Sequence, residues 1–406
     1  MNNCYTFCRP ALIAANPYNF SRHGSLTKTL ALACACLMGI AAPASALDIA
    51  WVSFHAADNM PSADAATDGF TEAPDKGYTD LLMNAGHDVT RIVGSAAPDV
   101  SQLNTFDLVM ISRSNNSGNF QTAASSAAWS SIEAPTIHLG GYAIRGGTGG
   151  GARLGFTTGE TIPDTTGPVN LTINNTSHPI FTGVARDAGN VMVDVYADLV
   201  PMPFAPNTVQ RGISVNTNAL TSGGTLLASL PSMTTADPPG QVGMVIGEFP
   251  AGTTMSNGSM DVQQGHRLVF LTGSREQDIT SQGAGIYDLS ATGATMLLNA
   301  VNYMGGLGPV LTGDVTGNGV VDINDYVIIR NNFNMTGKTP EQGDVNFDTV
   351  VNFADFRLWK NNRTAGAGAG LNLEAELAAL VPEPGSLALA LLGALALLSG
   401  ARRRVG

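Results

Sequence analysis

Residues 47–305 contain short apolar runs that alternate with segments in which apolar residues recur every three or four positions. The short runs predict buried strands, and the three-to-four spacing predicts helices with one apolar face. Because strands and helices alternate, the pattern favours an α/β domain with a doubly wound, mostly parallel sheet. The predicted strands are 48–54, 87–93, 107–112, 134–139 and 268–272, and the predicted helices are 76–85, 123–131 and 290–304.

This order of elements resembles the glutamine amidotransferase-like, flavodoxin-like fold, including its branch related to trehalose-utilisation proteins. Four segments carry the likeness: 81–89 (LLMNAGHDV), 104–111 (NTFDLVMI), 178–183 (HPIFTG) and 268–273 (LVFLTG). Catalytic members of that family place a cysteine on the turn after a strand, whereas here the strand at 134–139 runs into Gly140-Gly141. All four cysteines of the chain precede residue 47. Amidotransferase chemistry through a cysteine is therefore excluded.

A ligand pocket is expected at the carboxyl ends of the parallel strands. The candidate residues there are His138, Gly140, Gly141, Arg275 and Glu276. Two alternatives stay open: His138 is a satisfied histidine at a strand end, and Arg275 with Glu276 is a surface ion pair.

Two further segments of this domain allow more than one interpretation. The run 146–151 (GGTGGG) suggests a phosphate cradle but lacks the lysine and spacing of a P-loop, which favours a flexible loop. The carboxylates of Asp58, Asp64 and Asp68 follow the first strand. They could meet a metal or a sugar, and solvation explains them equally well.

An internal repeat lies nearer the carboxyl terminus, because 314–325 returns thirty residues later as 344–355. Oxygen ligands occur at positions 1, 3, 5, 9 and 12 of each segment, with a backbone carbonyl expected at position 7. That spacing wraps a twelve-residue loop around Ca²⁺, a hard cation that prefers oxygen ligands. The repeat predicts two calcium ions held by Asp314, Thr316, Asn318, Val320, Asp322, Asp325, Asp344, Asn346, Asp348, Val350, Asn352 and Asp355.

Each loop ends in aspartate and leads into one helix, at 326–333 and 356–362, without a helix before the loop. This combination resembles the type I dockerin domain over 313–362. The family implies a cohesin-like partner, and its paired recognition region maps onto Arg330, Asn331, Lys360 and Asn361. Two residues depart from the family pattern: Thr316 replaces the usual asparagine or aspartate, and Thr349 replaces the glycine of the sharp turn.

A small core inside the repeat should couple folding to calcium binding, because so short a module buries little apolar area. Trp359 and Phe333 are interpreted as packing residues rather than partner anchors. The predicted core residues are Val321, Val327, Ile328, Val351 and Leu358.

The first 46 residues form a predicted signal peptide: Lys28, an apolar run at 30–42, and small residues at 44–46 that suit cleavage before Leu47. An uncleaved anchor is the alternative. Loss of this segment, which has three basic residues and no acidic one, would lower the formal charge from −12 to −15. An acidic protein of this kind does not favour nucleic acid as a partner.

The last 26 residues begin with Val381 and contain Pro382, Glu383 and Pro384, then an apolar run at 387–398 and three arginines at 402–404. This layout resembles the PEP-CTERM sorting signal, which implies processing by an exosortase after transient membrane association. A plain membrane anchor is the alternative. The expected divisions are 1–46 signal peptide, 47–305 α/β domain, 306–312 linker, 313–362 calcium module, 363–380 spacer and 381–406 sorting tail.

Two functions are compatible with these features. The first is an exported cell-surface or extracellular-matrix protein with a calcium-dependent docking module and a non-catalytic ligand-binding domain. The second is a secreted carbohydrate-active hydrolase that degrades polysaccharide, a class in which dockerins occur. The absence of a motif-supported carboxylate pair in 47–305 favours the first.

Overall fold

The computed structural model describes residues 46–160, 164–166, 169–192, 195–210, 212–214, 219–230, 243–274, 279–307, 311–317, 320–346 and 348–364. The predicted signal peptide up to residue 45, the spacer from residue 365 on and the sorting tail lie outside these residues, as do Arg275, Glu276 and Asn318. Among the described residues, no helix is both long and apolar enough to cross a membrane.

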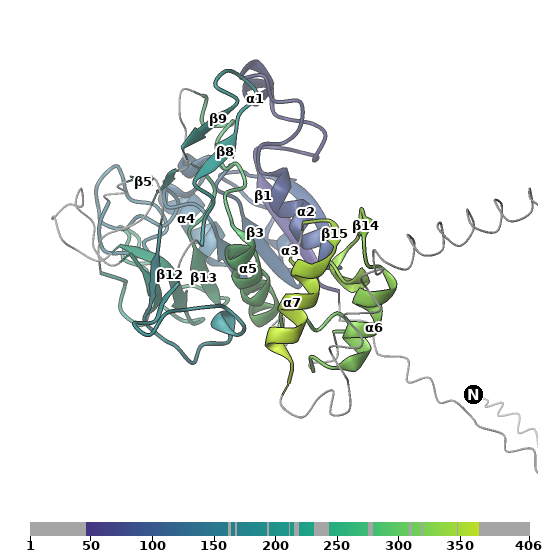
Figure 1. Cartoon of the computed structure of the whole chain (residues 1–406). Helices are drawn as coiled ribbons and strands as arrows, with labels where there is room; N and C mark the ends of the chain where they lie inside the picture. Colours follow the sequence, from purple (N-terminus) through teal and green to yellow (C-terminus); the bar gives the residue numbers. More distant parts are fainter. Residues whose placement is uncertain are drawn as a thin grey trace, which may run out of the picture. The chain divides into compact units, whose positions relative to one another are not determined.

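The α/β domain is built on a nine-stranded sheet whose first half is parallel (Figure 1). The parallel strands, in spatial order, are β2 (Asp88–Val93), β1 (Asp48–Ser53), β3 (Leu108–Ile111), β4 (Thr136–His138) and β13 (Arg267–Phe270). β1, β3, β4 and β13 are almost entirely buried, which explains their continuous apolar sequences. The expected parallel α/β sheet is therefore present.

The second half of the sheet is antiparallel, which the sequence pattern did not predict. It continues from β13 through β12 (Met244–Phe249), β11 (Thr225–Ser229), β6 (Leu171–Ile173) and β7 (Val191–Met192). Smaller pairs join β5 (Asp164–Thr166) to β10 (Gly212–Ser214) and β8 (Leu199–Pro201) to β9 (Thr208–Gln210). The antiparallel strands of the second half make the main sheet mixed, and the two small pairs are separate sheets.

The connection from β1 to β2 and the connection from β3 to β4 cross the sheet in opposite directions. Because such connections are right-handed, their helices lie on opposite faces of the sheet. α2 (Lys76–Asn84) connects β1 to β2, and α4 (Ala123–Ser130) connects β3 to β4. The long α5 (Ala291–Met304) lies on the same side as α2 (Figure 1). Shorter helical segments are α1 (Ala63–Thr67), α3 (Val100–Leu103), η1 (Ser117–Phe120) and η2 (Pro179–Phe181).

The main apolar core lies between the sheet and these helices. Trp51 of β1 is fully buried and stacks on Tyr78 of α2, with ring centres 5.8 Å apart. The apolar positions of α5 face inward, as their spacing predicted, and Met296, Leu297 and Val301 are fully buried. Burial of each such side chain contributes about 1.5–3 kcal/mol relative to an exposed one.

The calcium module contains two helices, α6 (Ile323–Asn331) and α7 (Phe353–Asn362). Both begin three residues earlier than predicted, inside the twelve-residue loops. The reason is capping, because Asp322 and Asn352 each accept a backbone N–H of the first turn through their side chains. Between the helices lie β14 (Met335–Thr336), η3 (Pro340–Gln342) and β15 (Val350–Val351), and β14 pairs with β15.

The core of the module differs in part from the predicted set. Val321, Val351 and Trp359 are buried as expected, and Ile328 and Leu358 pack against this core. Val327 is only half-buried and is not part of the cluster. The inward face of α6 consists instead of Tyr326 and Ile329, which lie three residues apart on one side of the helix. The buried cluster is Val315, Val321, Tyr326, Ile329, Val345, Val351, Phe356 and Trp359.

Candidate functional site

The first calcium loop is closed by the carboxylate at its last position. Asp325 is fully buried, and its Oδ1 accepts the backbone N–H of Thr316 at 2.9 Å. Its Oδ2 accepts the N–H of Asp322 at 2.7 Å. The Thr316 hydroxyl lies 3.3 Å from Asp314 Oδ1 and 2.9 Å from Asp325 Oδ1. Positions 1, 3, 9 and 12 of the loop are therefore brought together.

The second loop repeats this closure. Asp355 is fully buried and accepts backbone N–H groups of Val345, Asn346 and Asn352 at 2.8, 3.1 and 2.7 Å. Asp344, at position 1, accepts the N–H of Asp348 at 3.0 Å and that of the next residue at 2.8 Å. The loop backbone thus folds around the carboxylates at its two ends.

Burial of these carboxylates has an electrostatic cost. Burial, together with the charges of Asp355 and Asp348, raises the pKa of Asp344 to about 6 against the hydrogen bonds that lower it. Burial also raises the pKa values of Asp325 and Asp355. Crowded carboxylates that resist ionisation favour a divalent cation, which neutralises several of them together.

The donor set fits calcium in chemistry, since every predicted ligand presents oxygen and calcium takes six to eight oxygens. Within the described residues, no three His, Cys, Asp or Glu side chains already converge with metal-binding geometry. The carboxylates bond loop N–H groups instead, so ion binding requires them to turn toward the loop centre. Asn318, at position 5 of the first loop, lies outside the described residues.

The sharp turn of the second loop has a left-handed backbone conformation at the position where the family pattern has glycine. Thr349 has φ +66°, in the left-handed region. A β-branched residue is disfavoured there, and glycine is the residue that adopts it without strain. The departure from the repeat pattern at position 6 therefore carries a backbone cost.

The four candidate partner-binding residues lie at corresponding places in the two helices. Arg330 and Asn331 are exposed in the last turn of α6, and Lys360 and Asn361 are exposed near the end of α7. Trp359 is fully buried and its Nε1 donates to the carbonyl of Asp322 at 2.7 Å. Its geometry matches the packing role expected for it.

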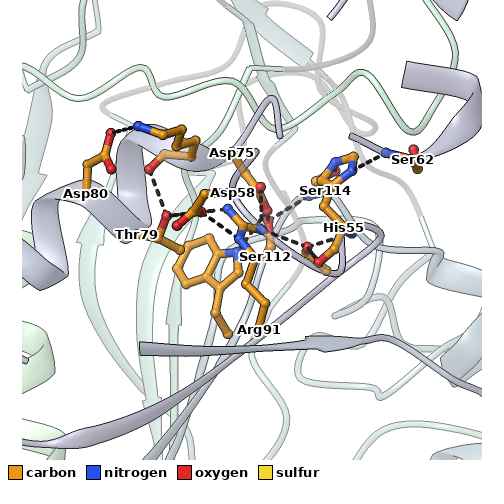
Figure 2. A network of polar contacts seen from close by, with 12 residues as sticks. His55, Asp58, Ser62, Asp75, Thr79, Asp80, Arg91, Ser112 and Ser114 are labelled. Carbon is orange, nitrogen blue, oxygen red and sulfur yellow. Dashed lines mark hydrogen bonds and ion pairs between the residues drawn. The ribbon is translucent and has the colours of Figure 1, made fainter. Parts of the chain in front are cut away.

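In the α/β domain, the crevice expected at a topological switch point lies where β1 and β3 end. Figure 2 shows a buried polar network at this place. Arg91 of β2 donates to Asp75 at 2.9 Å and to Asp58 at 2.7 Å, and Asp75 is fully buried. The second oxygen of Asp75 accepts from Trp51 Nε1 at 2.9 Å and from the hydroxyl of Ser112 at 2.7 Å. These charges satisfy one another and anchor the segment after β1.

His55 extends the network toward the end of β3 (Figure 2). Its Nδ1 accepts the backbone N–H of Ser62 at 3.0 Å, so Nε2 carries the proton of the neutral ring. Nε2 lies 3.0 Å from the hydroxyl oxygen of Ser114 and donates its proton to it. Burial lowers the pKa of His55 and keeps it neutral. The pair therefore lacks the free ring nitrogen with which a histidine would activate serine.

The three carboxylates after β1 have protein partners. Besides its bond to Arg91, Asp58 accepts from the hydroxyl of Thr79 at 2.6 Å. Asp64 accepts from Gln282 Nε2 at 2.6 Å, and Asp68 accepts from the backbone and hydroxyl of Thr280 at 2.9 and 2.7 Å. Asp64 and Asp68 therefore tie this segment to residues 280–282, whereas Asp58 ties it to α2 and β2, so the three carboxylates have separate partners.

Three of the pocket residues predicted at the carboxyl edge, His138, Gly140 and Gly141, are described, and all three are buried. His138 is buried, packs against the Phe156 ring at 4.9 Å, and has a pKa lowered to about 3 by burial and by the charge of Arg267. It lies in the core, and its Nδ1 has no hydrogen-bond partner among the described residues. Gly140 and Gly141 are buried at the end of β4.

Three residues at this edge were missed by sequence reasoning. Arg113 follows β3, and Tyr142 and Arg145 follow β4; the Cζ atoms of the two arginines lie 4.6 and 5.5 Å from the centre of the tyrosine ring. The signal that could have found them is their place directly after two buried strands, where parallel sheets bind ligands.

The glycine-rich loop after β4 holds a carboxylate from its own chain. Gly149 and Gly151 donate their N–H groups to the two oxygens of Glu160 at 2.6 and 2.9 Å. A phosphate at these N–H groups would have to displace this side chain.

Comparison with solved structures finds similar folds at low identity. A ThuA-like protein from Bacteroides uniformis is 11% identical over 64% of this chain and 94% of that chain, with a TM-score of 0.36. A ThuA-like protein from Parabacteroides merdae is 9% identical over 66% and 92%, with a TM-score of 0.32. A comparison with curated proteins gives no match.

Comparison with family models identifies the calcium module. Residues 312–364 match the dockerin type I domain. The match spans both loops and both helices, including each candidate ligand and each exposed residue at the helix ends. The chain therefore consists of an α/β domain followed by a dockerin type I module at 312–364.

Proposed function

We propose that this protein is exported and is displayed at the cell surface or in the extracellular matrix, where its dockerin module docks it to a partner in a calcium-dependent manner. The observation that carries the proposal is the match of residues 312–364 to the dockerin type I domain. The α/β domain then presents a ligand-binding surface at the carboxyl edge of its sheet and has no catalytic role.

Two calcium ions would be held by the twelve loop residues predicted from the repeat. The ions would neutralise the buried carboxylates and fix the turns from which α6 and α7 begin. The helix ends would then present Arg330, Asn331, Lys360 and Asn361 to a cohesin-like protein. Duplicated exposed residues at the ends of two related helices support this assignment.

Two observations support a non-catalytic α/β domain. Each cysteine of the chain lies before residue 47, so the folded domain contains no thiol nucleophile. At the switch point, the neutral His55 donates to Ser114 and does not act as its base. A polysaccharide-degrading hydrolase gains no support from the described acids there, because Asp58, Asp64 and Asp68 bond to separate protein donors.

Export and sorting rest on the two ends of the sequence. The signal segment at 1–46 would direct the chain out of the cytoplasm. An exosortase would then recognise Pro382, Glu383 and Pro384 while the apolar run at 387–398 crosses the membrane for a short time. Polysaccharide is a candidate ligand once the domain is outside the cell.

The experiment uses the protein without its two terminal signals. Binding to a panel of cohesin domains is measured in calcium and in chelator, beside a glycan-binding and glycan-hydrolysis screen. We expect cohesin capture in calcium alone, and its weakening in a variant with Asn331→Ala and Lys360→Ala together. Capture that persists in chelator, or glycan hydrolysis above the buffer control, would contradict the proposal.

A further inference from the structure

A buried arginine lies across the carboxyl edge of the sheet. Arg113, directly after β3, is 4% exposed. A Cβ atom added at Gly140 would lie 3.2 Å from its Cα, and one added at Gly273 would lie 2.8 Å from its Cβ. Glycines at the ends of β4 and β13 therefore make room for this arginine. It lies beside the Gly140-Gly141 turn that follows β4.

Arg113 supports an aromatic ring that a second arginine also contacts. Its Cζ lies 4.6 Å from the centre of the Tyr142 ring, within the range of a cation–π interaction. Arg145 Cζ lies 5.5 Å from the same centre, and its Nε donates to the carbonyl of Tyr142 at 3.0 Å. The terminal Nη atoms of Arg145 donate to no described residue. Half-burial lowers the pKa of Arg145 and shows the cost of holding its charge there.

A third guanidinium lies beside the second. The backbone N–H of Arg153 donates to the carbonyl of Arg145 at 3.0 Å. Its Nη1 donates to the carbonyls of Gly150 and Ala152 at 3.1 and 2.8 Å, whereas its Nε is buried and has no hydrogen-bond partner among the described residues. A buried donor without a partner is unusual in a folded protein and points to an acceptor that binds there.

Glu160 is the acidic group that faces these arginines, and it does not neutralise them. Its charge raises the pKa values of Arg145 and Arg153, but both of its oxygens accept N–H groups of the glycine-rich loop. No ion pair joins it to either arginine among the described residues. The chain as a whole is acidic, with 32 Asp and Glu against 20 Lys and Arg, so neighbouring arginines are not a general property of its surface.

We propose that this edge binds the oxyanion group of a small ligand, with Arg145 and Arg153 as the binding residues and Arg113 with Tyr142 as the platform that positions Arg145. A guanidinium presents paired N–H donors that match a carboxylate or a phosphate. The inference rests on the proposed ligand-binding role of the α/β domain and names its ligand class. A carboxylate would come from an acidic sugar, and a phosphate would come from a phosphorylated metabolite or free phosphate.

The test is calorimetry on the protein without its terminal signals, titrated with galacturonate, inorganic phosphate and neutral galactose. We expect one of the two oxyanions to bind saturably, with galactose silent. Arg145→Gln should weaken that binding about 10- to 100-fold, the loss expected for a hydrogen bond between charged groups. Arg145→Lys keeps the charge but loses the paired donors, so it should weaken that binding less than Arg145→Gln does.

The matched control is Arg186→Gln, because Arg186 is an exposed arginine that donates to the carbonyl of Thr176. It should leave the affinity unchanged, and the melting temperature of each variant verifies folding. Equal binding by wild type and a folded Arg145→Gln variant would overturn the site, as would no binding of either oxyanion. Binding of a neutral glycan alone would overturn the oxyanion class while preserving the proposed ligand-binding role, and failed cohesin capture would refute the docking role separately.

Discussion

Thr364 and Val321 are joined by two hydrogen bonds: Thr364 N–H donates to the Val321 carbonyl at 3.0 Å, and Val321 N–H donates to the Thr364 hydroxyl at 3.0 Å. Thirty residues earlier, Asn334 N–H donates to the Val351 carbonyl at 2.7 Å. The segment after each helix therefore bonds to the loop that begins the other helix. The sequence repeat produces a reciprocal arrangement in which each half completes its counterpart.

The first prediction follows from this link. Thr364→Val removes the hydroxyl that accepts from Val321 and keeps a β-branched side chain. The variant should lower the free energy of unfolding of the calcium-loaded module by about 1 kcal/mol, the typical net value of one hydrogen bond. Thermal melts of the two proteins in excess calcium measure the difference. Thr336→Val, at an exposed position of β14, is the control, and an equal change in both variants would argue against the link.

A second prediction concerns the strained turn of the second loop. Glycine at position 349 would adopt φ +66° without the steric penalty that threonine meets there. Thr349→Gly should therefore tighten calcium binding at the second loop by about fivefold, equivalent to about 1 kcal/mol. Calorimetry compares it with Thr336→Gly, which lies in a strand and should bring no gain. Weaker binding by Thr349→Gly would show that the threonine side chain helps the site.

The third prediction is a pH dependence that His138 confers on the α/β domain. Its folded pKa is about 3 against an ordinary value of 6.5. As pH falls below 6.5, the unfolded chain takes up a proton that the folded domain does not, so the free energy of unfolding falls by up to about 1.4 kcal/mol per pH unit. This loss continues until the pH approaches the folded pKa.

The measurement is the melting temperature of the domain between pH 7.5 and pH 4.5. His138→Leu should flatten the decline, because leucine is apolar and suits the contact with Phe156. Ile137→Val, a neighbouring core change without a titrating group, should keep the wild-type slope. Parallel slopes in all three proteins would mean that His138 does not control the acid response.

The sequence predicted the parallel half of the sheet because each of its central strands is a buried apolar run, as at 108–111. It did not predict the antiparallel half, because strands of two or three residues such as β6 and β7 are too short to carry a periodic pattern. Their direction depends on pairing between segments distant along the chain, since β6 pairs with β11 and β7 pairs with β6.

Local capping and long-range packing explain the remaining differences. The early start of α6 comes from the Asp322 side chain, which caps its first turn. Packing against α7 places Tyr326 and Ile329, rather than Val327, in the core. The cluster of Arg113 with Tyr142 joins residues that follow different strands. Only the pairing of β3 with β4 brings them together.

A fourth prediction concerns processing of the two ends. Mass spectrometry of the native protein should find an amino terminus near Leu47 and no peptide from 387–406, because the signal peptide and the apolar tail would both be removed. Expression in a host without an exosortase serves as the control and should retain the tail. An intact carboxyl terminus in the mature native protein would refute processing by an exosortase.

The last prediction is that the dockerin module folds only with calcium and takes up two ions per chain. Without metal, buried carboxylates such as Asp344 and Asp355 repel each other, and burial raises their pKa values. The ions remove that cost and hold the turns that begin α6 and α7. Loss of calcium to a chelator should therefore reduce the helical signal of the module in the circular dichroism spectrum.

The two sites should fill in order, with the second loop first. Each loop carries three carboxylates, because Asp348 at position 5 of the second is balanced by Asp322 at position 9 of the first. The loops differ at position 3, where the second offers the amide oxygen of Asn346 and the first the hydroxyl of Thr316, a weaker calcium ligand. Strain at Thr349 opposes this ranking, but we expect the better ligand at position 3 to outweigh it. Calorimetry with Asp314→Ala and Asp344→Ala tests the order, and Asp344→Ala should remove the tighter site. A stoichiometry below two, or helicity that survives chelation, would refute the coupling of folding to calcium, and equal losses from both variants would refute the ranking alone.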